Sequence, residues 1–291
     1  MNARDEGGEF ALIRQYFQDL TATRPDVLHG IGDDAAVLAI PAGLELVVST
    51  DTLVQGVHFP LAALPADIGF KSLAVNLSDM AAMGAEPRWA TLALTMPAAT
   101  PEFLQGFGAG FAESARPHNV ALVGGDLTRG PLSITVQIMG TVPAGSALLR
   151  SGARPGDQIW VTGELGSAAL GLAVLQGRHV SKETGLDVCV LRLNRPEPRV
   201  QAGLLLRGVA SAAIDISDGL FTDLNHLLCA SGVGACVELD RIPMGAALSA
   251  LPDEAVRWRY ALGGGDDYEL CFTAPASAAE EIEVRLRACA C

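Results

Sequence analysis

Residues 30–37 read Gly30-Ile31-Gly32-Asp33-Asp34-Ala35-Ala36-Val37, a tight turn that carries two adjacent carboxylates to the start of an apolar, strand-like run. Adjacent negative charges repel each other, and a packed domain keeps them only where water, arginine or a metal ion offsets the repulsion. A solvated turn and a metal site are therefore the two interpretations of this stretch. The rest of the chain decides between them.

Acidic turns of the same kind recur along the chain. They are Ser49-Thr50-Asp51, Ser78-Asp79, Gly124-Gly125-Asp126, Asp215-Ile216-Ser217-Asp218-Gly219 and Gly264-Gly265-Asp266-Asp267. Several follow short β-rich runs, which places hydroxyl and carboxylate oxygens at strand ends. Hard divalent cations such as Mg²⁺ prefer oxygen ligands of this type. The repetition favours a metal site over a series of unrelated solvated turns.

The composition limits the classes of protein that fit. The chain has 291 residues, of which 49% are hydrophobic, and this length and composition predict two medium domains with a sizeable core. The formal net charge is −13, which disfavours a nucleic-acid partner because DNA and RNA binding needs a basic surface. An acidic enzyme that handles phosphates would need divalent cations to bring like charges together.

Lysine and cysteine usage exclude several common kinds of site. Lys71 and Lys182 are the two lysines of the chain, and neither lies in the Gly-Lys-Ser/Thr motif of a P-loop or in a protein-kinase strand motif. A bound nucleotide would therefore be held by metal, arginine and backbone groups. The six cysteines form no zinc-type Cys-x-x-Cys pair. We find no secretory signal and no unbroken apolar run of about 18 residues, and we expect a cytoplasmic protein without membrane association.

Hydrophobic periodicity predicts alternating helices and strands in the first half. We expect helices at 9–20, 66–83 and 101–115, and strands at 35–40, 44–50, 89–96, 120–123 and 132–142. The runs 35–40 and 44–50 are predicted to form a hairpin through residues 41–43. Ser72, Asn76 and Asp79 share one face of the second helix, so we expect this stripe to face water or a polar ligand.

The second half continues the alternation. We expect strands at 158–162, 212–216, 235–239 and 268–273, and helices at 167–176, 220–230, 254–262 and 280–288. Ser217 is a candidate helix cap, whereas Asp215 and Asp218 at the same corner could share one ion. A change of composition predicts domains at 1–150 and 151–291. No strand follows the last helix, so we expect the C-terminal domain to continue beyond residue 291.

Six blocks of the sequence, in order, resemble the thiamine-monophosphate kinase family of the aminoimidazole ribonucleotide synthetase-like superfamily. They read GIGDDAA (30–36), STDTLVQGVHF (49–59), AVNLSDMAAMG (74–84), GGDLT (124–128), IDISDGL (214–220) and DYEL (267–270). The resemblance implies an ATP-dependent and Mg²⁺-dependent phosphorylation of thiamine monophosphate to thiamine diphosphate. It also implies an α/β (α+β) fold of two domains, in which the N-terminal sheet forms a β-barrel across a homodimer. Pairing an open sheet edge favours the same dimer.

The resemblance assigns residues by motif to metal, nucleotide and substrate. The metal ligands, for several Mg²⁺ ions, are Asp34, Ser49, Thr50, Asp51, Asp79, Asp126, Asp215 and Asp218. The ATP-binding residues are Gly125, Asp126, Arg150 and Ser217, and the substrate-binding residues are His58 and Asp266. Asp33 is left with a structural role beside Asp34. We expect no protein nucleophile, because transfer between two anionic phosphates is mainly a matter of positioning and charge neutralisation.

The sequence departs from the family pattern at two places. The family usually has Gly-Gly-Glu-Asp where this chain has Gly-Gly-Asp-Asp at 264–267, so Asp266 is one methylene shorter. The family also supplies an aromatic residue to the thiamine site from a segment beyond position 291. These departures bear on substrate binding, whereas the metal-binding motifs match throughout.

Two alternatives to a thiamine-monophosphate kinase stay open. The first is another ATP-using reaction of the superfamily, namely hydrogenase maturation, selenophosphate synthesis or a purine-pathway cyclisation. Hydrogenase-maturation members act through a C-terminal cysteine, and Cys291 ends this sequence. The second alternative is a regulator that binds nucleotide or metal without turnover. The intact kinase blocks favour the kinase.

Overall fold

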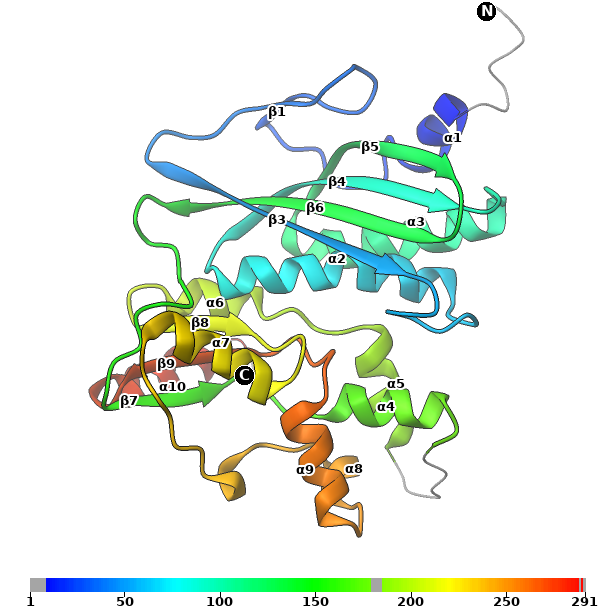
Figure 1. The fold of residues 1–291 in the computed structure, drawn as a ribbon. Helices are drawn as coiled ribbons and strands as arrows, with labels where there is room; N and C mark the ends of the chain where they lie inside the picture. Colours follow the sequence, from blue (N-terminus) through cyan, green and yellow to red (C-terminus); the bar gives the residue numbers. More distant parts are fainter. Residues whose placement is uncertain (1–8, 179–184, 288, 290–291) are drawn as a thin grey trace, which may run out of the picture. The chain divides into compact units, whose positions relative to one another are not determined.

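The computed structural model describes residues 9–178, 185–287 and 289 (Figure 1). Cys291, the terminal cysteine considered for the hydrogenase-maturation alternative, lies outside the described residues. The chain divides into two compact units. Unit 1 comprises Met1–Leu77 and Glu86–Ala144, and unit 2 comprises Ser78–Ala85 and Gly145–Cys291. The long helix α2 (Pro65–Ala82), predicted at 66–83, therefore begins in unit 1 and ends in unit 2.

Unit 1 is built on a four-stranded mixed sheet in the order β3-β6-β4-β5. Its strands are β3 (Leu44–Val54), β6 (Ser133–Pro143), β4 (Glu86–Met96) and β5 (Ala121–Arg129). β4 and β5 run parallel, whereas β3 and β4 each pair antiparallel with β6. Alternate side chains of β6 (Ile134, Val136 and Ile138) are fully buried, so one face of this sheet belongs to the core.

Helices α2 and α3 (Pro101–Ala115) run along one side of this sheet (Figure 1). Their backbones approach so closely that a Cβ atom at Gly69 would lie 2.0 Å from the carbonyl oxygen of Phe107. A Cβ atom at Gly110 would lie 1.8 Å from the carbonyl oxygen of Ala66. Glycine is therefore required at both contact points. The Thr100 side chain caps α3 by accepting a hydrogen bond from Phe103 N.

The predicted hairpin between 35–40 and 44–50 is wrong. β2 (Val37–Leu38) pairs with β1 (Val27–His29), and β3 pairs with β6 along its whole length. The eleven residues of β3 match the eleven of β6, which satisfies far more backbone groups than a pairing with β2 would. The predicted N-terminal helix is confirmed as the shorter α1 (Glu9–Tyr16).

Unit 2 contains an antiparallel sheet in the order β7-β9-β8. Its strands are β7 (Asp157–Val161), β9 (Leu270–Pro275) and β8 (Ala212–Asp215). The helices are α4 (Ser167–Leu175), α5 (Leu186–Asn194), α6 (Val200–Leu206), α7 (Leu220–Ser231), α8 (Ala246–Ser249), α9 (Glu254–Gly263) and α10 (Ala279–Arg287). Leu165, Ile214, Ile216 and Leu227 belong to its central apolar cluster.

Short 3₁₀ turns complete the chain: η1 (Arg116–His118), η2 (Leu239–Arg241) and η3 (Ala276–Ala278). The strand predicted at 235–239 is wrong, because this segment is exposed coil that leads into η2. An apolar run forms a strand only where the edge of a neighbouring strand can pair with its backbone groups. The last predicted helix is confirmed by α10, although residue 288 lies outside the described part of the chain.

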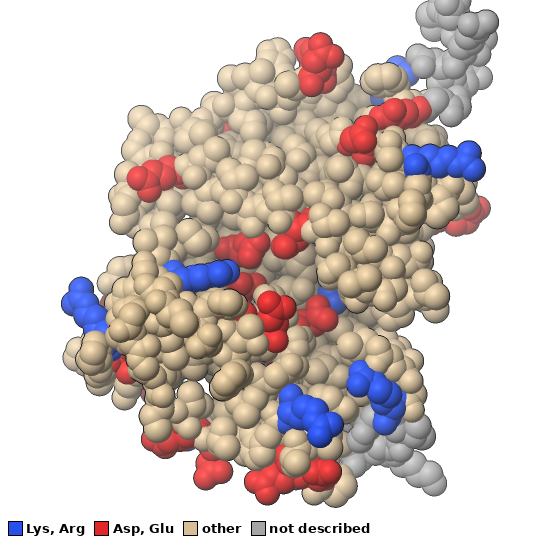
Figure 2. Space-filling view, viewed as in Figure 1, with Lys and Arg blue, Asp and Glu red and all other residues tan. Residues whose placement is uncertain are grey.

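The fold is therefore α+β, with a mixed sheet in unit 1 and an antiparallel sheet in unit 2. Over the described residues the unit 1 sheet is open rather than a closed barrel, and β3 and β5 form its two edges. Figure 2 shows that most of the face in view carries neither acidic nor basic side chains, in keeping with the 18% of charged residues. Of the helices that the structure describes, none is both long and apolar enough to cross a membrane.

Candidate functional site

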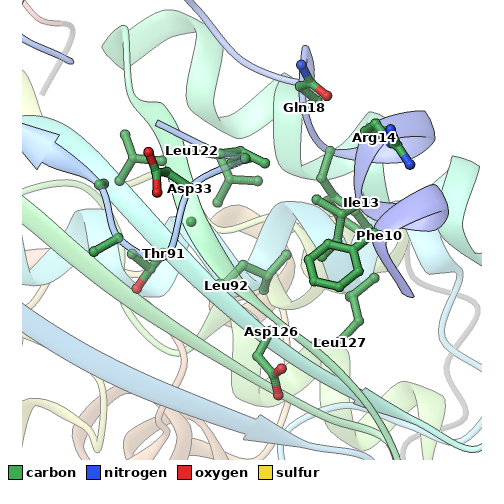
Figure 3. Close-up of a pocket in the computed structure, with 18 of the residues that line it drawn as sticks. Phe10, Ile13, Arg14, Gln18, Asp33, Thr91, Leu92, Leu122, Asp126 and Leu127 are labelled. Atoms are coloured by element: carbon green, nitrogen blue, oxygen red, sulfur yellow. The ribbon is translucent and has the colours of Figure 1, made fainter. Parts of the chain in front are cut away.

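A cavity of about 920 Å³ in unit 1 brings together two of the predicted acidic turns. The turn at 31–36 contributes Asp33 and Asp34, and β5 contributes Gly124, Gly125 and Asp126. Helix α1 supplies apolar and polar side chains to the same cavity. Figure 3 shows Phe10, Ile13 and Arg14 of α1 on one side of the cavity and Asp33 on the other. The cavity therefore has an apolar wall and an acidic edge.

The two neighbouring aspartates of the opening turn behave differently. One carboxylate oxygen of Asp33 accepts a hydrogen bond of 2.9 Å from the backbone N–H of Asp34. Both residues are exposed. Asp33 thus stabilises the turn locally, while the carboxylate of Asp34 is exposed at the cavity. This arrangement leaves Asp34 available to an ion or a ligand.

Gly125 has a backbone conformation that only glycine adopts without strain. Its φ is +153°, and a Cβ atom there would lie 1.9 Å from the carbonyl oxygen of Leu92. The strand predicted to end at residue 123 continues as β5 through the glycine pair, with a register shift between Ala90 and Thr91. The close approach of the two strands explains the glycine and sets Asp126 on β5 opposite Ala93.

Alternation along β3 separates the three consecutive candidate metal ligands. Ser49 and Asp51 lie opposite Ile138 and Val136, which are buried. Thr50 lies opposite Gln137, which is exposed, and so projects from the other face. The Ser49 and Asp51 side chains therefore share one face of the sheet, and the Thr50 side chain cannot join them on one ion.

Thr50 and Asp126 lie on the same open face but at opposite edges of the sheet. The row Thr52–Thr135–Ala93–Asp126 crosses all four strands on that face, and the hydroxyls of Thr52 and Thr135 are hydrogen-bonded at 2.8 Å. Three inter-strand spacings correspond to about 14 Å. Accordingly, no group of three His, Cys, Asp or Glu placed to hold a metal ion occurs among the described residues.

His58 follows β3 in an exposed turn. Its Nδ1 accepts a hydrogen bond of 3.0 Å from the backbone N–H of Val54. In the neutral ring the proton therefore resides on Nε2, which is left as a donor. His58 is thus oriented by the backbone of its own turn.

The polar stripe of α2, predicted to face water or a polar ligand, is mostly buried and does not face water. Ser72 Oγ donates to Gly69 O at 2.8 Å, and Asn76 Nδ2 donates to Ser72 O at 3.0 Å. Both side chains are buried because they satisfy their polarity along the helix itself. The buried Oδ1 of Asn76 has no hydrogen-bond partner among the described residues. Asp79, one turn further on, is partly buried.

In unit 2 the turns at 215–219 and 264–268 lie side by side. Asp266 N donates to Ser217 O at 2.9 Å, and Tyr268 N donates to Ile216 O at 2.8 Å. A Cβ atom at Gly265 would lie 2.5 Å from Ser217 O, so the two backbones are in contact. The structure therefore brings the predicted ATP residue Ser217 next to the predicted substrate residue Asp266.

Asp215 and Asp218 differ in their surroundings. Asp215 is buried and accepts a hydrogen bond of 2.8 Å from Ser78 Oγ, a residue of the same unit. Asp218 is exposed. Arg150 is exposed as well, and its carbonyl oxygen accepts a hydrogen bond of 3.0 Å from Ser231 Oγ. The predicted residues of this unit thus include one buried carboxylate and two exposed charges.

Asp223, which sequence reasoning missed, holds the turn at 217–219. Its Oδ2 accepts hydrogen bonds from the backbone N–H groups of Ser217, Asp218 and Gly219 at 3.0, 3.0 and 3.1 Å. Burial is the main cause that raises the pKa of Asp223. Ser217, a candidate helix cap, does not cap α7, because the N-cap residue is Gly219 and no side chain caps the helix. An acidic residue in the first turn of a predicted helix was the available signal.

A buried ion pair, also missed, anchors the neighbouring turn. Arg199 Nε and Nη2 donate to the two carboxylate oxygens of Glu269, each at 2.6 Å, and Thr162 Oγ1 donates to Oε2 at 2.7 Å. Burial raises the pKa of Glu269, and the hydrogen bonds from Arg199 oppose this shift. These partners are separated by 70 and 107 positions in the sequence, so no local pattern indicates them.

The turn at 264–268 is strained. Asp266 and Tyr268 have φ values of +69° and +52°, a left-handed conformation that costs about 1–3 kcal/mol per non-glycine residue. Tyr268 Oη donates to Asp266 Oδ1 at 3.2 Å. Between them, Asp267 accepts hydrogen bonds from Gly166 N and Ala168 N at the start of α4, and burial raises its pKa to about 7. Aspartate tolerates this conformation better than most residues, which fits Asp266.

Comparisons with known proteins agree over both units. Residues 32–142 match the family described as AIR synthase related protein, N-terminal domain, and residues 154–288 match the corresponding C-terminal domain. The chain is 52% identical to a thiamine-monophosphate kinase of Salmonella typhimurium over 92% of this chain and 83% of that protein.

Solved structures give the same result. A thiamine-monophosphate kinase from Stenotrophomonas maltophilia superposes with a TM-score of 0.87 and 47% identity, covering 95% of this chain and 88% of that one. AaThiL complexed with AMPPCP and TMP superposes with a TM-score of 0.76 and 31% identity, covering 82% and 78%. The chain therefore belongs to the thiamine-monophosphate kinase family.

Proposed function

We propose that this chain transfers the γ-phosphate of ATP to the phosphate of thiamine monophosphate, giving thiamine diphosphate and ADP. The observation that carries the proposal is the complex of the relative AaThiL with AMPPCP and TMP. AMPPCP is an analogue of ATP with a methylene group between the β- and γ-phosphorus atoms, so that complex holds the donor and acceptor types of this reaction. The identity of 52% to a thiamine-monophosphate kinase supports the same activity.

The cavity of unit 1 is a suitable place for the nucleotide. Its volume of about 920 Å³ lies in the range of ligand pockets. Phe10 and Ile13 offer an apolar wall to the base, and Gly125 lets the backbone approach the phosphates. We assign Gly125, Asp126, Arg150 and Ser217 to ATP. The exposed Arg150 can form a bidentate contact with a phosphate.

Mg²⁺ fits the chemistry of the acidic turns. The proposed ligands are Asp34, Ser49, Thr50, Asp51, Asp79, Asp126, Asp215 and Asp218, all of them hard oxygen donors. Two anionic substrates and a protein of net charge −13 repel one another, and neither lysine of the chain lies in a P-loop. When bound, Mg²⁺ would neutralise the phosphates and align donor with acceptor.

The side chains of the protein position the substrate rather than attack it. We assign His58 and Asp266 to thiamine monophosphate. His58 Nε2 offers a donor to the substrate phosphate because Nδ1 is engaged by Val54 N. We propose direct in-line transfer without a phosphoenzyme. Recovery of a phosphorylated enzyme after acid quench would contradict it.

A homodimer would complete the unit 1 sheet. β3 is an edge strand whose Leu46 and Val48 are 45% and 48% exposed. Exposed apolar edges are paired or covered in stable proteins. A second copy that closed the sheet into a barrel would pair the free backbone groups of β3 and cover these apolar side chains. We also propose that the boundary between the two domains lies between residues 150 and 151 and that the protein is cytoplasmic.

Incubation with ATP, Mg²⁺ and thiamine monophosphate tests the activity. We expect thiamine diphosphate and ADP in equal amounts by liquid chromatography. Omitting thiamine monophosphate should abolish ADP formation, and chelating Mg²⁺ with EDTA should abolish both products. ATP binding without thiamine diphosphate formation would instead support a non-catalytic regulator.

A further inference from the structure

We propose that Asp223 is a positioning residue for phosphoryl transfer, because its carboxylate fixes the turn that presents Ser217 and Asp218. This inference rests on the proposed function. Asp223 is not among the residues that the family motifs assign, and it touches neither substrate in the proposed arrangement. It acts through the backbone of the turn.

The turn at 217–219 has the geometry of an anion-binding cradle, in which the carboxylate of Asp223 takes the place of a bound anion. Three successive backbone N–H groups, those of Ser217, Asp218 and Gly219, converge on the single oxygen Oδ2 of Asp223 at 3.0–3.1 Å. Convergent N–H groups at a helix N-terminus are a common phosphate site. Here Asp223, 3% exposed, occupies that site. The backbone of this turn is therefore closed to substrate phosphate.

The occupied cradle has a chemical consequence. With the N–H groups engaged, the turn meets the substrates through the Ser217 hydroxyl and the exposed Asp218 carboxylate. A carboxylate and a phosphate repel each other, and a bridging cation such as Mg²⁺ would offset this repulsion. Asp223 thus converts a potential direct phosphate site into one that depends on Mg²⁺, and the turn must keep its shape for that purpose.

The surroundings fix the same turn from the other side. A Cβ atom at Gly219 would lie 2.9 Å from the backbone of Gly263, and Asp266 N donates to Ser217 O. Asp223 completes this enclosure, and it does not act as a cap of α7. Its hydrogen bonds go to residues that precede α7, which are the residues with proposed ligand roles.

Asp253 provides a matched control within unit 2. It caps α9 by accepting hydrogen bonds from Ala255 N and Val256 N at 2.9 and 3.3 Å. It is exposed, and its turn carries no residue proposed to bind metal, nucleotide or substrate. Both residues are thus carboxylates that accept backbone N–H bonds at a helix start, and only Asp223 serves the proposed site.

The test compares Asp223→Asn with Asp253→Asn. Asparagine keeps a carbonyl acceptor of the same shape but loses the charge that strengthens these bonds. We expect Asp223→Asn to lower kcat/KM for ATP at least tenfold and to raise the Mg²⁺ concentration at half-maximal rate. Asp253→Asn should leave both kinetic values unchanged. A loss below tenfold, or equal losses in the two variants, would overturn the proposal.

Amide hydrogen exchange keeps the proposal testable if Asp223→Asn folds poorly or if the wild-type protein proves not to be a kinase. In the wild-type protein we expect slow exchange at residues 217–219, and in Asp223→Asn at least tenfold faster exchange at these amides alone. Fast exchange at 217–219 in the wild type would overturn the proposal whatever the activity. Absence of thiamine diphosphate with slow exchange would overturn the proposed function but not the structural role of Asp223.

Discussion

The two units hold their acidic turns in different ways. In unit 1, Asp34 and Asp126 are exposed at the edge of a cavity, and the backbone around them is shaped by glycine. In unit 2, the turns at 215–219 and 264–268 are tied together by backbone bonds and anchored by the buried groups Asp223 and Glu269. Changes in unit 1 should therefore affect activity more than folding, whereas changes to the anchors of unit 2 should affect both.

The largest effect on stability is expected from Arg199→Ala. Arg199 and Glu269 are buried, and removing one partner of such a pair leaves an uncompensated charge at a cost of about 3–5 kcal/mol. Urea unfolding should show this loss of unfolding free energy. Arg287→Ala, which removes the exposed pair with Glu283, serves as the control and should change it by about 0.5 kcal/mol or less. Equal effects of the two variants would show that the Arg199 pair is not an anchor.

Asp51→Asn should lower activity strongly and change stability little, which is the opposite of the effect expected for Arg199→Ala. Losing one charged ligand of the proposed Mg²⁺ should cost about 3 kcal/mol of transition-state stabilisation, which is roughly a hundredfold in kcat/KM. Steady-state kinetics with saturating Mg²⁺ would measure this loss, and circular dichroism should show an unchanged fold. Full activity in Asp51→Asn would remove Asp51 from the site.

Gly125→Ala tests how far glycine shapes the acidic edge of unit 1. A Cβ atom at this position would meet Leu92 O at 1.9 Å, so the strands would have to separate at a cost of about 2 kcal/mol. Thermal unfolding would register the lower stability. Gly124→Ala is the matched control, since a Cβ atom there meets only a Thr91 methyl group at 3.9 Å. Similar Tm values for the two variants would contradict the close-approach argument.

The smallest expected effect is a pH dependence that differs between the units. In unit 2, burial raises the pKa of Asp267 to about 7. The folded state then binds more protons than the unfolded state, so stability from this group falls as pH rises from about 4 to 7. In unit 1, hydrogen bonds from Arg24, with further help from Arg88 and Trp89, lower the pKa of Asp26 to about 2. Its contribution is present above about pH 4 and is lost as pH falls towards 2.

Urea unfolding between pH 2 and 8 would separate these two contributions. Asp267→Asn should flatten the profile between about pH 4 and 7, where the raised pKa of Asp267 makes the wild-type protein lose stability. Asp26→Asn should lower the unfolding free energy above about pH 4 and flatten the profile below that pH. The assignment of Asp267 would fail if its variant kept the wild-type slope between pH 4 and 7.

The sequence was sufficient where the signal is local. The periodicity of α2, α3 and β6 predicted these elements closely, and the acidic turns stood out because glycine, hydroxyl and carboxylate residues recur together. Long-range partners were not predictable. The pairing of β3 with β6 and the ion pair of Arg199 with Glu269 join segments about 70 or more positions apart, and only folding brings such groups together.

Some local patterns had two physical solutions, and the sequence did not choose between them. Ser217 could cap the helix or present a ligand group, and in the structure no side chain caps α7, while Asp223 holds the turn that carries Ser217. Ser72 and Asn76 could face water or bond along the helix, and burial selects the second solution. The sequence of β3 predicts that Thr50 projects from the opposite face to Ser49 and Asp51. Only the pairing with β6 shows which of the two faces is buried.

The central proposal is that the Mg²⁺-dependent transfer requires acidic residues of unit 1 and of unit 2 alike. The most direct measurement is the rate of thiamine diphosphate formation over a range of Mg²⁺ concentrations in wild-type protein, Asp126→Asn from unit 1 and Asp218→Asn from unit 2. Because both residues are exposed, neither variant should unfold. The account predicts at least a tenfold lower kcat and a higher Mg²⁺ requirement in each variant. A wild-type rate and Mg²⁺ dependence in either variant would contradict it.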